Sequence, residues 1–140
     1  MRLDLYQQET ERLACDLQAM LDGARDRLLN QQTLSALEQA GVLHALQVLT
    51  ENAIGKAKLL IKQTGQAVPV SAYDAFAQLH REQVIDAEQM RQWTAAVGLR
   101  NRIVHDYLNV DMNLIDTLIK EQKYQLQLQF LLQPIESQDT

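Results

Sequence analysis

Apolar residues recur at intervals of three and four along almost the whole chain, and this spacing restricts the fold more than any other feature of the sequence. The interval is that of one face of an α-helix, whereas a half-buried strand alternates every second residue. The 140 residues include 23 Leu and 19 Gln, which favour helices, but only 5 Gly and 2 Pro. The spacing therefore predicts an all-α fold and excludes a collagen-like or low-complexity chain.

Capping residues divide this periodic sequence into helices. In a capping box, a side chain at the helix start pairs with one three residues later, and both Ser35 with Glu38 and Asp86 with Gln89 have this form. The pattern predicts a four- or five-helix antiparallel bundle. The expected helices cover residues 3–21 (or 3–29, if the first continues through Gly23), 34–65, 71–80, 86–104 and 111–133.

The chain offers no sign of a second domain or of an export signal. We expect one helical domain over residues 1–133, followed by a polar tail at 134–140. One cysteine, Cys15, excludes an intramolecular disulfide and a Cys-rich zinc cage. No apolar segment follows Arg2, so we expect no signal peptide and predict a cytoplasmic protein. The apolar runs are far shorter than the roughly 20 residues that a bilayer requires.

The net charge of −5 is distributed unevenly. Residues 1–51 carry 4 basic and 8 acidic groups, residues 52–110 carry 7 and 5, and residues 111–140 carry 2 and 5. Proteins that coat nucleic acid without specificity are usually basic overall. A polyanion would therefore bind through a local site in the middle third, unless these charges are only solvated helix faces. We interpret one set of lysines as such an exposed face: Lys56, Lys58 and Lys62.

The most distinctive segment lies at the end of the fourth expected helix. Asn101 and His105 continue the four-residue spacing of Trp93 and Val97, which predicts that all four lie on one buried stripe. Polar groups on such a stripe need partners, because an unpaired one costs about 1–3 kcal/mol. Arg100 precedes His105 by five residues, which places the two about 140° apart around a helix.

Leu99 and Ile103 add a second apolar edge to the same helix. A helix that is apolar on two sides is packed on two sides, one against its own bundle and one against a partner. We therefore expect a homodimer formed through this helix. Arg100 and His105 would lie near the seam between the two copies.

The segment GLRNRIVHDY at residues 98–107 resembles the R-x-x-x-x-H-x-Y signature of the HEPN superfamily, in its HepT toxin branch. Arg100, His105 and Tyr107 match the three named positions of the signature. Asn101 matches the polar residue that often follows the arginine. The order and spacing of the other expected helices also resemble this branch, so that the likeness covers most of the chain.

The resemblance implies a HEPN-like helical bundle that dimerises and cleaves RNA in a cleft at the dimer interface. It implies a metal-independent endoribonuclease that needs no cofactor, and therefore no metal ligands. It also implies a type II toxin–antitoxin pair, in which an MNT-type nucleotidyltransferase is the antitoxin. In this branch the antitoxin silences the toxin by transferring AMP to the motif tyrosine, here Tyr107.

The residue types suit this chemistry. RNA is cleaved without metal when a base takes the proton of the 2′-OH and that oxygen attacks the neighbouring phosphorus. His105 carries an imidazole, which can serve as base or acid. Arg100 carries a permanent charge and a forked donor for phosphate. Asn101 and Arg102 are candidates for supporting contacts to RNA phosphate, and Tyr107 can donate a hydrogen bond or stack on a base.

Other interpretations remain open. His105 could be a core histidine bonded to Asn101, and Tyr107 could be an interface aromatic. The whole chain could be a non-catalytic helical partner of a nucleotidyltransferase. Neither the RNA, the cut position nor the stoichiometry of a toxin–antitoxin complex follows from the sequence. Three side chains have no settled role: His44, His80 and Glu51, the last of which could pair with a motif arginine.

Overall fold

Six α-helices and one 3-10 turn make up the part of the chain that the structure, a computed structural model, describes, which is residues 2–135. The all-α prediction is confirmed. The tail predicted at 134–140 lies mostly outside the described residues. No helix within 2–135 is long and apolar enough to cross a membrane. The elements are α1 (Leu3–Leu29), α2 (Ala36–Gln63), α3 (Ala72–Arg81), α4 (Ala87–His105), η1 (Tyr107–Asn109), α5 (Met112–Lys120) and α6 (Gln125–Leu132).

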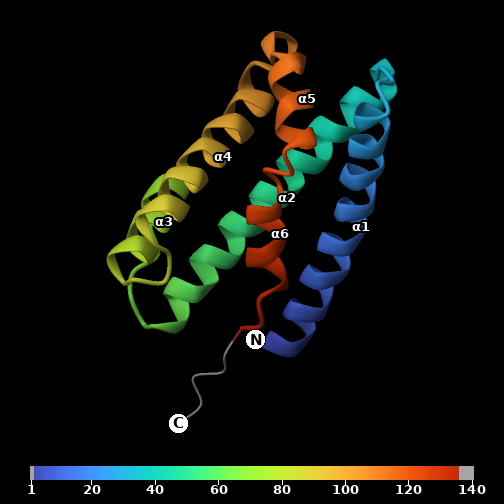
Figure 1. Ribbon diagram of the computed structural model, residues 1–140. Coiled ribbons are helices and arrows are strands. Elements are labelled where there is room, and N and C mark those ends of the chain that lie inside the picture. Colours follow the sequence, from blue (N-terminus) through green and yellow to red (C-terminus); the bar gives the residue numbers. More distant parts are fainter. Residues whose placement is uncertain (1, 136–140) are drawn as a thin grey trace.

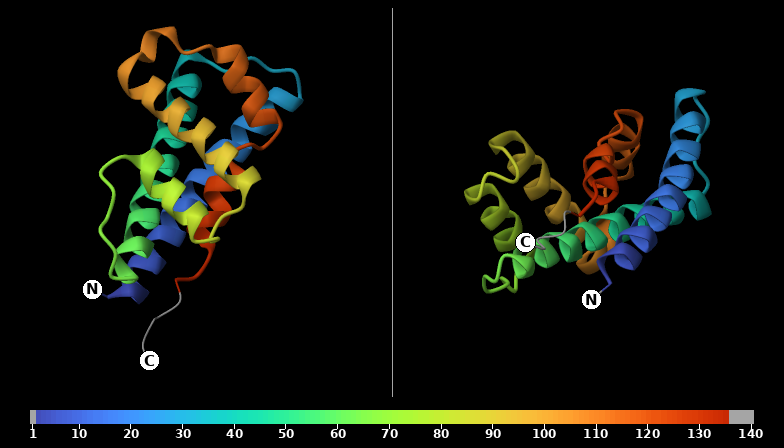
Figure 2. Two further views of the ribbon diagram at one scale, coloured as in Figure 1. Left: turned by 90° about the vertical axis from the view of Figure 1, so that its left-hand side faces the viewer. Right: turned by 90° about the horizontal axis from the view of Figure 1, so that it is seen from below.

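Helix α2 is the centre of the bundle, because α1, α3, α4 and α6 all pack against it. Figures 1 and 2 show α3 and α4 on one flank, α1 on the other, and α5 and α6 between them. Helix α5 packs on α1. Apolar residues therefore occupy a broad face of α2, and its buried side chains include Leu43, Leu46, Leu49, Ile54 and Ile61.

Three aromatic rings join α3, α4 and α6. Trp93 stacks on Phe76, with ring centroids 4.2 Å apart, and meets Phe130 edge-on at 5.2 Å. Trp93 and Phe76 are each only 1% exposed. Such pairs contribute about 0.5–1.5 kcal/mol beyond the burial of their area. Trp93 is thus a core residue that fixes α4 on the bundle and, with it, the motif at the end of α4.

The capping boxes predicted from sequence are confirmed. Ser35 Oγ accepts from Glu38 N at 3.1 Å, and Glu38 Oε1 accepts from Ser35 N at 2.8 Å. Asp86 and Gln89 form the equivalent pair at the start of α4. A cap of this kind is worth about 1 kcal/mol, because it satisfies backbone N–H groups that the helix cannot. The start of α4 is therefore fixed locally.

Three helices, α1, α3 and α5, are each followed by a glutamine whose backbone lies in the left-handed region. No pattern in the sequence predicts this conformation. Gln31, Gln83 and Gln122 have φ of 61°, 62° and 54°. At the last of these, Gln122 N donates to Ile119 O and the next amide to Leu118 O, each at 3.0 Å. This is the backbone closure that usually selects glycine. It divides the predicted last helix into α5 and α6, while α1 runs unbroken through Gly23.

The prediction that Lys56 lies on an exposed face is wrong. Its side chain is 2% exposed, and Nζ donates to the carbonyl oxygens of Phe130 at 2.7 Å, Leu131 at 3.2 Å and Gln133. Unpaired carbonyls at a helix C-terminus carry partial negative charge, which a cation stabilises. Lys56 thus ties the end of α6 to the middle of α2.

Burial of this ammonium gives a pH-dependent contribution to stability. Desolvation lowers the pKa of Lys56 from 10.5 to about 8, and the nearby Glu11 opposes part of that shift. Between pH 8 and 10.5 the unfolded chain therefore binds a proton at Lys56 that the folded chain has lost. Stability consequently rises with pH over this window, as far as this group is concerned.

We predict that the free energy of unfolding of wild type, minus that of Lys56→Met, increases between pH 8 and pH 10. Urea unfolding at several pH values measures this difference, and the subtraction cancels titrations common to both proteins. Lys58→Met is the matched control, since Lys58 is less buried and donates only to Val70 O. A wild-type minus Lys56→Met difference that stays level across this window contradicts the lowered pKa.

Candidate active site

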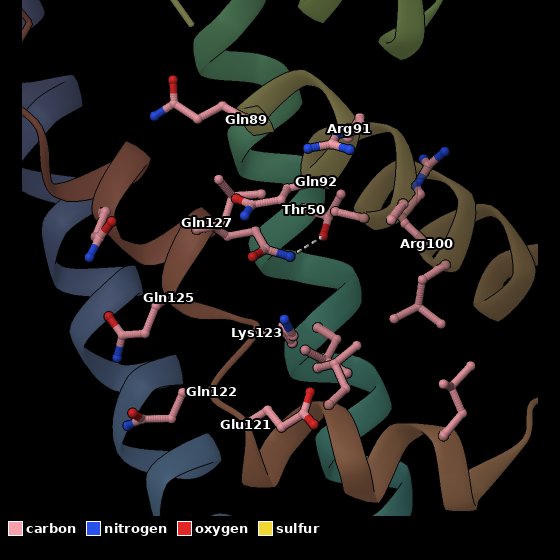
Figure 3. Close-up of a pocket in the computed structure, with 18 of the residues that line it drawn as sticks. Thr50, Gln89, Arg91, Gln92, Arg100, Glu121, Gln122, Lys123, Gln125 and Gln127 are labelled. Carbon is pink, nitrogen blue, oxygen red and sulfur yellow. Dashed lines mark hydrogen bonds between the residues drawn. The ribbon is translucent and has the colours of Figure 1, made fainter. Parts of the chain in front are cut away.

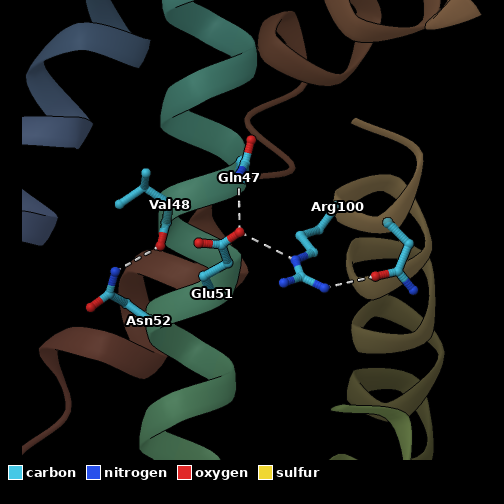
Figure 4. A network of polar contacts seen from close by, with 6 residues as sticks. Gln47, Val48, Glu51, Asn52 and Arg100 are labelled. Carbon is cyan, nitrogen blue, oxygen red and sulfur yellow. Dashed lines mark hydrogen bonds and ion pairs between the residues drawn. The ribbon is translucent and has the colours of Figure 1, made fainter. Parts of the chain in front are cut away.

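The motif arginine lies across the gap between α4 and α2, where it meets a carboxylate (Figure 4). Arg100 Nε is 3.4 Å from Glu51 Oε1, which is long for a hydrogen bond, so the interaction is chiefly that of opposite charges. The two side chains are 29% and 37% exposed. Glu51 Oε1 also accepts from Gln47 Nε2, one turn earlier on α2, at 3.0 Å.

A second partner holds the other side of the guanidinium. Arg100 Nη1 donates to Asn101 Oδ1 at 2.9 Å. Within the described residues no hydrogen bond is made by Arg100 Nη2. The arginine and the asparagine of the motif are therefore in direct contact, and the N–H groups of Nη2 have no acceptor among residues 2–135.

The predicted buried stripe is wrong at its C-terminal end. Asn101 and His105 are exposed, and neither shares the buried face of Trp93 and Val97. A four-residue step advances about 400° around the helix, so three such steps displace a residue by about 120°. The buried stripe instead continues through the half-buried Arg100. His105 is therefore not a core histidine bonded to Asn101.

The second apolar edge is also different from the expectation. Ile103 is 3% exposed and belongs to the core of its own chain, and Leu99 packs partly buried against that core. Neither residue forms a free apolar edge on α4. Leu99 and Ile103 therefore do not support the expected dimer, which has to be argued from other residues.

The motif histidine is the last residue of α4. Asp106 follows as the C-cap, and its carboxylate accepts from Asn109 Nδ2 at 2.7 Å, which closes the short turn η1. Tyr107 is the first residue of that turn and is 47% exposed. His105 and Tyr107 are therefore presented to solvent on a tight corner between α4 and α5.

Arg100 and His105 do not meet within one chain. His105 takes part in no hydrogen bond or ion pair in the described part of the chain, and the same holds for the exposed Arg102. Five residues of helix separate Arg100 from His105, which is about 140° of rotation. A reaction that uses both side chains needs a substrate that bridges them or a second copy of the chain.

Large apolar side chains surround the corner that carries His105. Val104, Tyr107 and Leu108 are 42%, 47% and 93% exposed. Isolated exposed apolar residues are ordinary, but several in one short segment mark a surface that another molecule covers. This corner is the part of the site at which a partner would bury apolar area.

A groove of about 780 Å³ lies on the side of α4 that faces α5 and α6 (Figure 3). Its floor includes Leu46 and Thr50 of α2, and Gln127 Nε2 donates to Thr50 Oγ1 at 3.3 Å. Arg100 also lines this groove. The arginine is thus the one motif residue that contributes both to the groove and to the polar contacts with Glu51.

The remaining histidines are surface residues. His44 on α2 and His80 on α3 are exposed. Among residues 2–135, no group of three or more His, Cys, Asp or Glu side chains is placed to hold a metal ion.

Fold and site together define a class: an all-helical protein in which one helix ends with arginine and histidine five residues apart. The sequence also matches a known protein family. Residues 15–131 match the family described as "Ribonuclease HepT-like". The chain belongs to this HepT-like ribonuclease family.

Two known proteins, one compared by sequence and one by structure, are also similar to this chain. A protein of Aphanizomenon flos-aquae (strain 2012/KM1/D3) named "tRNA nuclease HepT" is 30% identical over 83 residues. That alignment covers 59% of this chain and 56% of the relative, so only about half of the relative's length is spanned. A crystal structure described as a toxin–antitoxin with AMP-PNP has a TM-score of 0.63 at 19% identity, over 85% of this chain and 97% of that one. This second likeness establishes the fold.

Proposed function

We propose that the chain is a metal-independent endoribonuclease toxin of a type II toxin–antitoxin pair, acting in the cytoplasm. Its membership of the HepT-like ribonuclease family supports this. The observation that carries the proposal is the held Arg100 guanidinium, with an open Nη2, on the helix that ends in an exposed His105. Because the matched relative is named a tRNA nuclease, tRNA is the substrate class we propose.

In the proposed reaction, His105 removes the proton of a ribose 2′-OH. The 2′ oxygen then attacks the adjacent phosphorus and the bond to the 5′ oxygen breaks. That oxygen takes a proton from an acid, leaving a 2′,3′-cyclic phosphate and a 5′-OH. His105 suits the transfer because an imidazole can both accept and donate a proton. A second His105 across a two-fold axis could supply the acid.

Arg100 stabilises the charge that develops on the phosphate oxygens. Its open Nη2 donates to one of them, while Asn101 holds Nη1. Arg102 adds a positive charge on the exposed side of α4, where it attracts RNA without touching the reacting atoms. These assignments give Asn101 and Arg102 supporting roles and leave the chemistry to Arg100 and His105.

The site is proposed to be completed by a second copy of the chain. The exposed apolar corner formed by Val104, Tyr107 and Leu108 lies next to His105, so a dimer that covers it brings two motifs together. The rotation of roughly 140° around the helix between Arg100 and His105 then no longer prevents the two motif side chains from acting on one substrate. Each arginine would serve RNA held by both protomers.

Control is proposed to act through Tyr107. Its exposed hydroxyl is accessible to a nucleotidyltransferase of the MNT type, the antitoxin we propose. An AMP group there adds a negative charge that competes with RNA phosphate for Arg100 and Arg102, and its bulk obstructs the corner. Asp106 carries a negative charge beside the tyrosine, although its carboxylate is engaged by Asn109.

We predict that RNA cleavage requires both motif side chains. His105→Ala removes the proton-transfer group and lowers the cleavage rate of tRNA by about 10²–10⁴-fold. Arg100→Lys keeps the charge but loses the forked donor, and lowers the rate as well. Gel assays on purified protein measure both rates, and circular dichroism checks the fold.

His80→Ala is the matched control for this experiment, because it removes an exposed histidine far from the motif in sequence. It should cleave like wild type. If folded His105→Ala cleaves at the wild-type rate, the catalytic assignment is wrong. If wild type itself cleaves no RNA yet binds a nucleotidyltransferase, the chain is the non-catalytic partner that the sequence left open.

We predict a homodimer held by the apolar corner. Sedimentation at micromolar concentration should give about twice the chain mass of 16.0 kDa. Leu108→Glu places a charge in the covered surface and should yield monomers with reduced cleavage. Leu37→Glu alters another highly exposed leucine, in the first turn of α2, and should leave the dimer intact. Monomeric wild type that cleaves RNA contradicts the shared cleft.

We predict that co-expression with the cognate nucleotidyltransferase adds the mass of one AMP, or a small multiple, to this chain. Tyr107→Phe should abolish that increase, because it removes the accepting hydroxyl. Tyr73→Phe changes a tyrosine of similar exposure and should keep it. Mass spectrometry decides the outcome. Silencing without added mass on Tyr107 means that the antitoxin acts by complex formation alone.

A further inference from the structure

The carboxylate opposite the motif arginine occupies an unusual place in its helix. α2 contains two acidic residues, and Glu38 is used in the capping box. Glu51 lies in the middle of the helix, directly after the buried Thr50. Its Oε1 is held by Gln47 from the preceding turn. Glu51 is thus oriented by its own helix toward α4.

Around Arg100, the hydrogen-bond donors are divided between three directions. Nε is turned to Glu51 on α2, and Nη1 to Asn101 on α4. These contacts restrain the guanidinium plane from two sides, and the side that carries Nη2 remains for a phosphate oxygen. Without Glu51, the arginine would keep only a contact to its own sequence neighbour.

We infer that Glu51 is a positioning residue for RNA cleavage: it holds the Arg100 guanidinium so that Nη2 faces the scissile phosphate. The inference rests on the proposed function. Glu51 touches neither substrate nor reacting atoms and acts through Arg100 alone. Its charge is suited to the role, because a carboxylate attracts the guanidinium without competing for the face that phosphate needs.

If Glu51 only stabilised the fold, its loss would change stability and not specifically kcat. An ion pair with both partners partly exposed contributes little to stability. Loss of Glu51 should therefore leave the fold intact and act on kcat, since the arginine is misplaced when charge develops. Small displacements of a catalytic group cost up to about 10²-fold in rate.

The experiment measures tRNA cleavage by Glu51→Ala, Glu51→Gln and Glu51→Asp. We expect kcat to fall about tenfold in Glu51→Ala and Glu51→Gln, with KM within about threefold of wild type, and Glu51→Asp to recover part of the rate. Asn52→Ala is the matched control. Asn52 neighbours Glu51 on α2 but donates to Val48 O and not to Arg100 (Figure 4).

A double-mutant cycle separates action through Arg100 from any other effect. In an Arg100→Lys background, which keeps a charge and measurable activity, Glu51→Ala should change kcat less than twofold. Residues that act as a unit are non-additive in this way. A full further tenfold loss in that background overturns the inference.

A spectroscopic readout makes the two proposals distinguishable. The Nε NMR chemical shift of Arg100 should change in Glu51→Ala, which lacks the facing charge, and should stay closer to the wild-type value in Glu51→Asp. Wild-type protein that cleaves no RNA overturns the proposed function, whatever this resonance shows. Wild type that cleaves RNA while Glu51→Ala keeps the wild-type kcat overturns the role of Glu51 and leaves the proposed function standing.

Discussion

The structure depends on α2 being packed on several sides at once. A helix covered by one neighbour needs one narrow apolar stripe, but α2 contacts α1, α3, α4 and α6 and buries a broad face against them. Polar residues in such a helix need specific partners. Glu51 and Lys56, five residues and about 140° apart, meet this requirement in opposite directions. The first faces Arg100 on α4 and the second the carbonyls that end α6.

Features that depend on nearby residues could be predicted from the sequence. The capping boxes at Ser35 and Asp86 are hydrogen bonds between residues three apart, so their residue types suffice to locate them. The burial of Lys56 could not be predicted in this way, because its acceptors lie more than 70 residues away. Nor could the break at Gln122, where a glutamine adopts a backbone conformation that usually selects glycine.

The sequence motif named the residues of the candidate site, but the helical spacing placed two of them, Asn101 and His105, on the wrong face of α4. Extending the spacing of Trp93 and Val97 in steps of four places Asn101 and His105 inward, but each step overshoots one turn by about 40°. The residue that stays near the stripe is Arg100, whose long side chain reaches Glu51 from a half-buried position. An arginine suits this place because its stem packs while its charged end finds a partner.

This geometry also bears on how an acidic protein can act on RNA. With a net charge of −5, the chain gains little from non-specific attraction to phosphate. Glu51 further offsets the charge of Arg100, so that Arg102 is the motif arginine that attracts a polyanion without a facing carboxylate among the described residues. Under the proposed function, affinity would then come from shape and from contacts that a bound phosphate makes with the N–H groups of Arg100 that Glu51 and Asn101 leave free. Such a site would favour selective cleavage, because RNA has to fit the corner beside His105 to bring its phosphate to Arg100.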